Sequence, residues 1–385
     1  MRFFGLSAAK VLSLCAALAC QVSAAPSSPA SSKHVSKRDF GPVTVYTPPS
    51  TFEKERSLYG RSVVLSDKTI LATSEIYDPS ADPNKSFFPI FRSADQGKTW
   101  KQISQAKDQV NNWGFRYQPF LYELPAPFGG FPAGTVLLAG NSIPKDLSKT
   151  QLDLYASTDK GLSWKFVSHI AAGGKALPNN GLTPVWEPFL LLNGNQLICY
   201  YSDQRDSRYG QKMVHQVTSD LRAWGPVVDD VTYPVYDYRP GMPIVSKLPN
   251  GKYIMTYEFY GAKEGGFSVY YKISADPTKF GSATGVVLKA TDGHVPVGSP
   301  YNVWSPAGGA NGSIIVSASS DSDVFVNKGL GEPGSQWVRV KTNAPKAYSR
   351  SLAVGINRNT EFYIVAGGEL NQGPTNKVTF TSQSI

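Results

Sequence analysis

Short apolar runs separated by tight turns recur along this chain of 385 residues. In each of six units a polar or aromatic residue precedes an apolar run, and a turn of Gly, Asn or Asp leads into a second one. No long stretch keeps the 3.6-residue period of an amphipathic helix, so the pattern predicts paired strands and little helix. The predicted hairpins cover residues 61–75, 117–120 with 135–141, 187–203, 239–258, 301–303 with 313–319, and 350–352 with 361–369.

An eight-residue motif occurs twice after these hairpins. Residues 93–100 and 157–164 both read Ser-x-Asp-x-Gly-x-Ser/Thr-Trp. In such a segment the short polar side chains bond their own backbone, Gly adopts a positive φ, and Trp opens the next strand. The motif resembles the Asp-box of sialidase-like β-propellers, which closes the turn between the third and fourth strands of a blade. We therefore expect both motifs on outer turns, with Trp100 and Trp164 in matching core positions.

The spacing of the units predicts the fold class. Degenerate forms of the motif follow at residues 218–224 and 274–280. The units recur at intervals of roughly 50–70 residues, as four-stranded blades with variable loops do. We predict an all-β protein in which residues 39–385 form a single six-bladed β-propeller of four-stranded blades. A β-sandwich would not need six equivalent hairpins.

The first 38 residues have the composition of a removable leader. Residues 1–24 combine basic residues, an apolar run and a small-residue end, which is typical of a secretory signal peptide rather than of a membrane span. Residues 25–38 are rich in Ser, end in a dibasic pair and predict a pro-segment. We expect a secreted, extracellular protein whose mature chain starts near Asp39. The sequons at Asn84 and Asn311 leave glycosylation open.

Charge and metal-ligand content argue against several function classes. The leader holds five Lys or Arg and no Asp or Glu, so without it the net charge falls from +9 to +4 and nucleic-acid binding loses its main support. Cys199 lies in an apolar run and predicts a buried thiol. His169, His215 and His294 lack the spacing of metal ligands. We expect a monomer without metal, cofactor or membrane association.

One face of the predicted propeller carries the candidate chemistry. The first strand of each blade lines the axis, so its start and the end of the second strand emerge on the same face. The predicted residues there are Arg61, Tyr117, Gln118, Trp186, Glu187, Arg239, Tyr301, Asn302, Tyr348 and Arg350 at strand starts, and Glu75, Asn141, Asp203, Glu258 and Glu369 at strand ends. Converging acids and aromatic rings indicate a site that binds or cleaves sugars, although an ion-paired or capping role is the alternative for any single acid.

Glycoside hydrolysis requires two carboxyl groups, one that protonates the leaving oxygen and one that acts as nucleophile or activates water. Glu187 lies between Trp186 and Pro188, and hydrophobic neighbours would raise its pKa as a general acid requires. Glu258 ends an apolar strand in the next unit and could meet Glu187 across the mouth. The reserve candidates are Asp203, Glu75 and Glu369.

Four segments carry a more specific resemblance: 184–188 (Pro-Val-Trp-Glu-Pro), 239–243 (Arg-Pro-Gly-Met-Pro), 255–258 (Met-Thr-Tyr-Glu) and 347–351 (Ala-Tyr-Ser-Arg-Ser). The chain resembles the fungal exo-1,5-α-L-arabinanases of glycoside hydrolase family 93 over essentially its whole predicted domain. The resemblance implies a retaining enzyme that releases arabinobiose from the non-reducing end of linear arabinan. By position, its two glutamates and nearby tyrosine are Glu187, Glu258 and Tyr348. The residues expected to bind substrate are Arg61, Tyr117, Gln118, Trp186, Asp203, Arg239, Tyr301, Asn302 and Arg350.

The roles of the two glutamates follow from a further resemblance, because related sialidases pair a Tyr with a Glu on the nucleophilic side. We expect Glu258, assisted by Tyr348, to be the nucleophile and Glu187 the acid/base, and the reverse assignment stays open. A retaining enzyme needs carboxyl groups roughly 5–5.5 Å apart. The hydroxyl of Tyr348 should lie within hydrogen-bonding reach of Glu258.

Two other functions are compatible with the sequence. In a sialidase, Arg61, Arg239 and Arg350 would clamp a substrate carboxylate, but the Arg-Ile-Pro signature of sialidases is missing at residues 61–63. A propeller lectin would show the same aromatic mouth without catalysis. Lectin propellers repeat near-identical sites in every blade, whereas the residues at the strand starts here differ from blade to blade.

Overall fold

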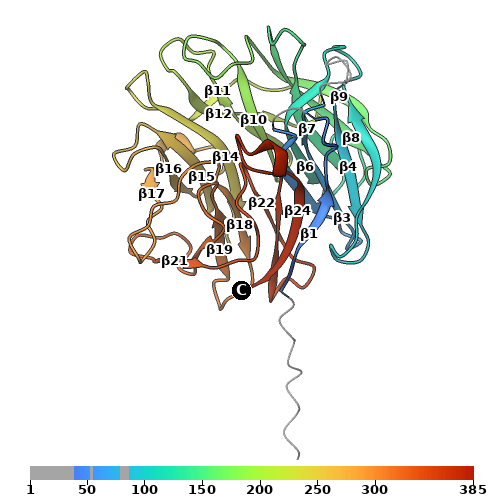
Figure 1. Cartoon of the computed structure of the whole chain (residues 1–385). Coiled ribbons are helices and arrows are strands. Elements are labelled where there is room, and N and C mark those ends of the chain that lie inside the picture. The colour runs from blue at the N-terminus through green and yellow to red at the C-terminus, as the bar shows by residue number, and fades with distance from the viewer. Residues whose placement is uncertain (1–38, 53–54, 79–85) are drawn as a thin grey trace, which may run out of the picture. The chain divides into compact units, whose positions relative to one another are not determined.

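The computed structural model describes residues 39–52, 55–78 and 86–385. The predicted signal peptide, the predicted pro-segment and the Asn84 sequon lie outside these residues. The described chain forms six four-stranded antiparallel sheets, which are the blades of a propeller (Figure 1). The predicted all-β, six-bladed β-propeller is confirmed.

From the axis outward, the first blade consists of β2 (Ser57–Val64), β3 (Ile70–Ile76), β4 (Phe87–Ser93) and β5 (Lys101–Lys107). The second consists of β6 (Phe115–Glu123), β7 (Val136–Ser142), β8 (Thr150–Ser157) and β9 (Lys165–Gly173). The third consists of β10 (Val185–Asn193), β11 (Gln196–Asp203), β12 (Lys212–Thr218) and β13 (Val228–Val231). The fourth blade consists of β14 (Arg239–Lys247), β15 (Tyr253–Tyr260), β16 (Phe267–Ser274) and β17 (Val286–Val287). The fifth consists of β18 (Tyr301–Ser305), β19 (Ser313–Ser317), β20 (Val324–Asn327) and β21 (Trp337–Val340). The sixth consists of β22 (Ser351–Val354), β23 (Glu361–Ala366), β24 (Val378–Ser384) and β1 (Phe40–Tyr46).

The described chain has two 3-10 turns, η2 (Phe280–Ser282) and η3 (Gly373–Thr375). Within the same residues, no helix is long and apolar enough to cross a membrane.

The ring closes through strands from both ends of the described chain. The inner strands contact one another in the order β2, β6, β10, β14, β18, β22 and back to β2. The outermost strand of the sixth blade is β1, which pairs with β24 and lies beside it in Figure 1. Pairing the first strand with the last sheet holds the ends together, so the ring has no break at its seam.

The blades pack on each other through both of their faces. The central strands β7 and β8 are buried along their entire length. Between the second and third blades, the rings of Phe120 and Phe189 lie 4.6 Å apart. A sheet covered on both faces carries apolar residues in unbroken runs instead of in alternation, which explains the continuous apolar strands of the sequence.

Both Asp-box motifs form the predicted turns between third and fourth strands. In the first blade, the Ser93 hydroxyl donates to Asp95 at 2.8 Å and accepts the N–H of Gly97 at 2.8 Å. In the second blade, the hydroxyl of Ser157 makes the corresponding bonds to Asp159 and Gly161, each at 2.7 Å. The side chains thus bond the backbone of their own turn, as expected.

The two tryptophans are less equivalent than the sequence predicts. Trp164 is buried, and its Nε1 donates to the Ser104 hydroxyl of the preceding blade at 3.3 Å. Trp100 is only partly buried, packs on Phe380 of β24 at 5.4 Å, and donates to the carbonyl of Gly97 in its own turn. Both rings contact the preceding blade, but that blade covers Trp164 more completely.

A further box closes the fifth blade and was missed in the sequence because Asn replaces the usual Ser. Asn327 Oδ1 accepts the N–H groups of Gly329 and Gly331 at 2.9 and 3.0 Å. Trp337 packs on Tyr271 of the fourth blade, with ring centroids 5.5 Å apart. Contact between a box turn and the preceding blade is therefore a recurring way of joining blades.

Replacing Trp164 by Ala should lower the free energy of unfolding by about 3–5 kcal/mol, because a large buried ring leaves a cavity between two blades. Replacing the less buried Trp100 by Ala should lower the free energy of unfolding by a smaller amount. Urea unfolding measures both losses. Leu162→Ala, in the same turn as Trp164 but 54% exposed, is the matched control. A loss below about 1 kcal/mol for Trp164→Ala would contradict this account of the turn.

Candidate active site

A β-bulge interrupts the inner strands near their starts and directs side chains toward the axis. Register shifts occur in the pairings of β2, β6, β10 and β14 with the following strands. Each blade has a non-glycine residue with positive φ in or just before its inner strand: Tyr59 (49°), Gln118 (60°), Glu187 (59°), Met242 (60°), Ser299 (44°) and Ser349 (62°). Left-handed non-glycine residues are strained and cluster at functional sites.

The sequence contained a signal for this ring of bulges. In four blades the positive-φ residue precedes a proline: Gln118-Pro119, Glu187-Pro188, Met242-Pro243 and Ser299-Pro300. Proline restricts the backbone of the residue before it and supplies no N–H to the sheet. A repeated residue–proline pair at the start of the inner strand could therefore have marked the bulges.

Three glutamates, Glu75 buried and Glu187 and Glu258 half-buried, each accept the backbone N–H of a positive-φ residue in the next blade. Glu75 Oε1 accepts from Gln118 at 2.7 Å, Glu187 Oε2 from Met242 at 3.2 Å, and Glu258 Oε2 from Ser299 at 2.7 Å. All three line one cavity of about 930 Å³. The bulges thus fix the carboxyl groups at the end of the axis where first strands start and second strands end.

Glu187 has a raised pKa, but several groups support its anion. Burial is the largest effect and raises its pKa. It is opposed by the Ser202 hydroxyl, which donates to Oε2 at 2.5 Å, by the N–H of Met242, and by the charges of Arg239 and Arg61. The backbone N–H of Glu187 itself donates to the side chain of Gln118 at 3.1 Å, which fixes its position.

Glu258 has weaker support for a negative charge. Burial and, to a smaller extent, the negative charge of Glu187 together raise its pKa to about 8. Against these effects stand only the N–H of Ser299 and the more distant charge of Arg239. At neutral pH Glu258 therefore carries a proton more readily than an ordinary glutamate does.

Glu75 is the third carboxyl group in the cavity. Both oxygens are engaged, with the hydroxyl of Tyr77 at 2.6 Å and the N–H of Gln118 at 2.7 Å. Burial raises its pKa to about 7. Glu75 thus holds the backbone of Gln118, whose side chain accepts the N–H of Glu187, so Glu75 helps to position Glu187 through Gln118.

Tyr348 lies in the cavity among aromatic and acidic groups. Its ring packs edge to face on Tyr59, with centroids 5.2 Å apart. Burial and the charges of Glu258 and Glu187 raise its pKa, so the hydroxyl stays protonated. Within the described chain no hydrogen bond joins Tyr348 to Glu258, so the contact predicted between these two side chains is not formed.

The cavity collects seven of the predicted catalytic or substrate-binding residues: Tyr117, Gln118, Trp186, Glu187, Arg239, Glu258 and Tyr348. It also contains the reserve acids Glu75 and Glu369. The guanidinium of Arg239 donates to the amide oxygens of Asn180, Gln204 and Gln211. Since these partners are neutral, the charge of Arg239 acts on Glu187 and Glu258, whose pKa values it lowers.

Two of the predicted arginines lie outside the cavity. Arg350 is fully buried and donates to the backbone carbonyls of Ser322 and Asp323, so it holds the fifth blade to the sixth. Arg61 donates to the carbonyl and the hydroxyl of Ser349 at 2.9 and 2.7 Å. β2 starts four residues before Arg61, at Ser57, because the bulge lengthens the strand, and this places Tyr59 rather than Arg61 at the mouth.

Three further predicted binding residues also lie outside the cavity, where their contacts stabilise the fold. Asp203 pairs with both Nε and Nη2 of Arg205, at 2.9 and 2.7 Å. Asn302 donates to Ile244 and Thr256, and Tyr301 lies under the guanidinium of Arg61. Tyr301 and Asn302 line a depression at the opposite end of the inner strands. Asn141 is likewise buried and bonds Val185.

Sequence reasoning missed several residues of the cavity: Leu58, Tyr59, Tyr77, Leu147, Leu177, Pro178, Gln211, Tyr260, Phe267 and Leu370. Most lie one or two residues from a predicted position or on loops above the strands. Tyr260 is two residues beyond Glu258, on the same face of β15, so extending the predicted strand would have found it.

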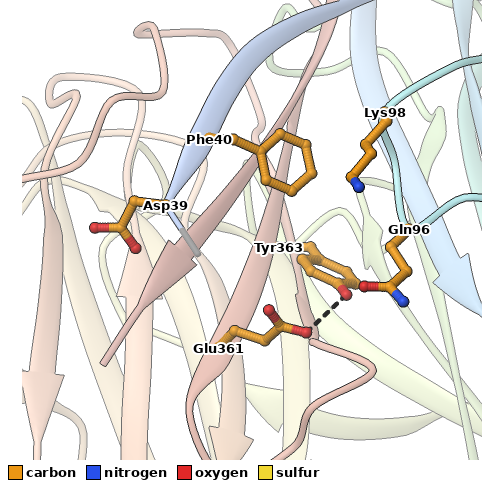
Figure 2. A pocket seen from close by; sticks show the side chains of 6 residues that line it. All are labelled: Asp39, Phe40, Gln96, Lys98, Glu361 and Tyr363. Atoms are coloured by element: carbon orange, nitrogen blue, oxygen red, sulfur yellow. Dashed lines mark hydrogen bonds between the residues drawn. The ribbon is translucent and has the colours of Figure 1, made fainter. Parts of the chain in front are cut away.

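A second cavity, of about 360 Å³, lies at the seam of the ring (Figure 2). It contains the carboxyl groups of Asp39 and Glu361. Asp39 accepts from Gln383 and Ser384, and Glu361 accepts from the Tyr363 hydroxyl at 3.0 Å. Asp39 therefore helps to close the ring, Glu361 holds its own hairpin, and the cavity lies by the first box turn.

The histidines of the described chain each contact one aspartate, at nitrogen–oxygen distances from 2.7 to 3.0 Å: His169 with Asp153, His215 with Asp230, and His294 with Asp321. Cys199 is buried and free. Among the described residues, no group of three or more His, Cys, Asp or Glu could hold a metal ion.

Comparison with known proteins gives a consistent picture. No protein-family model matches the sequence, and no curated protein matches it. Among solved structures, an α-L-arabinanase from Penicillium chrysogenum complexed with arabinobiose is 50% identical, with a TM-score of 0.87, over 90% of this chain and 98% of that one. A glycoside hydrolase family 93 α-L-arabinofuranosidase from Fusarium graminearum, also with arabinobiose, is 48% identical, with the same coverage and TM-score.

A sialidase from Streptococcus pneumoniae is 10% identical, with a TM-score of 0.59, over 90% of this chain and 71% of that one, and so shares the fold alone. The high identity to the Penicillium and Fusarium enzymes over nearly their whole length, together with two glutamates that line one cavity, shows that this chain belongs to glycoside hydrolase family 93.

Proposed function

We propose that this protein is an exo-acting, retaining α-L-arabinanase that cleaves linear α-1,5-linked arabinan and releases arabinobiose from the non-reducing end. The observation that carries the proposal is the pair Glu187 and Glu258, two carboxyl groups in one cavity with different electrostatic support. The arabinobiose complexes of two relatives support the choice of substrate.

The electrostatics favour Glu187 as nucleophile and Glu258 as acid/base, the reverse of the assignment expected from the sequence. A nucleophile must be ionised, and Glu187 accepts two hydrogen bonds beside Arg239. A general acid must hold its proton near neutral pH, which a pKa of about 8 allows for Glu258.

The reaction then runs in two steps. Glu258 gives its proton to the glycosidic oxygen while Glu187 attacks the anomeric carbon, so the carbon–oxygen bond breaks and a glycosyl ester forms. Glu258, now ionised, removes a proton from water, which attacks the anomeric carbon and releases Glu187. Tyr348 lines the same cavity and keeps a neutral hydroxyl, because the charges of both glutamates help to raise its pKa.

The walls of the cavity support exo action. Loop residues Leu147, Leu177 and Pro178 and the rings of Tyr117 and Trp186 border the side of the cavity next to Glu187. Aromatic rings pack on the apolar faces of sugars. A volume of about 930 Å³ is sufficient for a short oligosaccharide.

The two alternative functions lose their structural basis. A sialidase clamp requires three converging arginines, but of the three predicted ones only Arg239 lines the cavity. A lectin would not require two carboxyl groups with raised pKa values facing one cavity.

The proposal is tested by incubating the protein with linear arabinan and following the products by chromatography and NMR. Arabinobiose should be the sole early product, first released as the anomer with retained configuration. A ladder of oligomers of mixed length would contradict exo action, and initial release of the inverted anomer would contradict Glu187 as nucleophile.

The cellular setting is part of the proposal. The leader composition supports secretion, with removal of residues 1–24 and cleavage of the pro-segment after Arg38. The propeller of residues 39–385 would then act outside the cell as a monomer. Sequencing the N-terminus of the secreted protein tests the cleavage site.

A further inference from the structure

Two exposed aromatic rings form the outer edge of the fourth blade beside the cavity. Tyr260 and Phe267 are 47% and 38% exposed, and both line the cavity. They are directly paired across β15 and β16, with ring centroids 5.0 Å apart. Large exposed aromatic pairs are unusual on a soluble surface unless something binds them.

These rings lie next to Glu258 rather than Glu187. Tyr260 is two residues after Glu258 on the same strand, so the two side chains share a face about 7 Å apart along β15. Phe267 accepts the N–H of Gly298 through its carbonyl at 2.8 Å, and the N–H of the next residue, Ser299, donates to Glu258. The pair therefore extends the cavity outward from the proposed acid.

The aromatic residues of the cavity differ sharply in burial. Tyr59 and Trp186, on the side of Glu187, are 3% and 7% exposed. Tyr260 and Phe267, on the side of Glu258, are open to solvent. A closed side accommodates a chain end of limited length, whereas a polymer has to leave through an open side.

We propose that Tyr260 and Phe267 form an aromatic platform that binds the part of the arabinan chain on the leaving-group side of the cleaved bond. This rests on the proposed function, because the acid protonates the leaving oxygen and the leaving chain must start beside it. Furanose rings present apolar faces that pack on aromatic side chains, and two adjacent rings can support successive sugars.

The test compares two substrates that differ only on the leaving-group side. Arabinobiosyl fluoride has a single leaving atom, whereas 1,5-α-L-arabinohexaose has four leaving sugars. In the Tyr260→Ala/Phe267→Ala variant, the ratio of kcat/KM for arabinohexaose to that for the fluoride should fall about tenfold, or about 1.4 kcal/mol. Tyr260→Phe should keep most of the ratio because it keeps the ring.

Leu162→Ala, which removes an exposed apolar side chain far from the cavity, is the control and should leave the ratio unchanged. An unchanged ratio in the double variant, or an equal loss on both substrates, would overturn the platform. If the wild-type protein cleaves neither substrate, the proposed function fails instead. Each single variant, at an exposed position, serves if the double variant is unstable.

Discussion

Replacing Glu187 by Gln should lower kcat on linear arabinan by about 10⁴-fold or more, because the amide cannot form the glycosyl ester. The substitution keeps the size of the side chain and can still accept from Ser202 and Met242. Thermal unfolding should therefore change little. Steady-state kinetics beside a melting curve measures both quantities.

Glu332→Gln is the matched control for Glu187→Gln. Glu332 pairs with Lys252 at the surface, outside the cavity, so its loss should leave turnover near the wild-type level. Trapping of the ester with a slow fluorinated substrate and mass spectrometry should place the sugar on Glu187. A label on Glu75 or Glu258, or near-normal turnover in Glu187→Gln, would refute its role as nucleophile.

Replacing Glu258 by Ala should lower kcat on arabinan by about 10²–10⁴-fold, the usual contribution of a general acid. With arabinobiosyl fluoride, the rate of the first step should fall much less, because fluoride leaves without needing a proton. Added azide should restore part of the turnover by attacking the glycosyl ester in place of activated water. Equal loss on both substrates without azide rescue would indicate a structural role for Glu258.

The pH profile provides an independent measure of the same group. The acid must be protonated in the free enzyme, so kcat/KM on arabinan should fall as pH rises through the upper apparent pKa of the pair, about 8. Glu258→Ala should lose this basic limb. In Glu187→Gln the residual activity should show the limb at lower pH, because the neighbouring charge that raises the pKa of Glu258 is gone.

The outline of the site could be read from the sequence because its signals are local. Glu187 and Glu258 stand at the start and end of apolar strands, and a strand end in a propeller points to a known face. The side chain bonds of the box turn lie within a few residues, so Ser93 and Ser157 marked the blades directly. The hairpin period then determined the number of blades.

Which side chains enter the cavity was decided by the tertiary structure. A bulge adds one residue to an inner strand, and with a period of two such a shift sends every following side chain to the other face. That is why Tyr59 lines the cavity and Arg61 does not. Arg350 and Asp203 resemble binding residues in the sequence, but carbonyls from the fifth blade and the guanidinium of Arg205 engage them.

The difference in electrostatic support between the two glutamates was also beyond the sequence. The apolar neighbours of Glu187 suggested the acid, yet Ser202 and Met242, which bond its carboxylate, come from the next strand and the next blade. Electrostatic support depends on atoms within a few ångströms, whatever their separation in the chain. The sequence by itself thus determined the blades and the identity of the acids, whereas their roles depend on contacts that only the closed ring brings together.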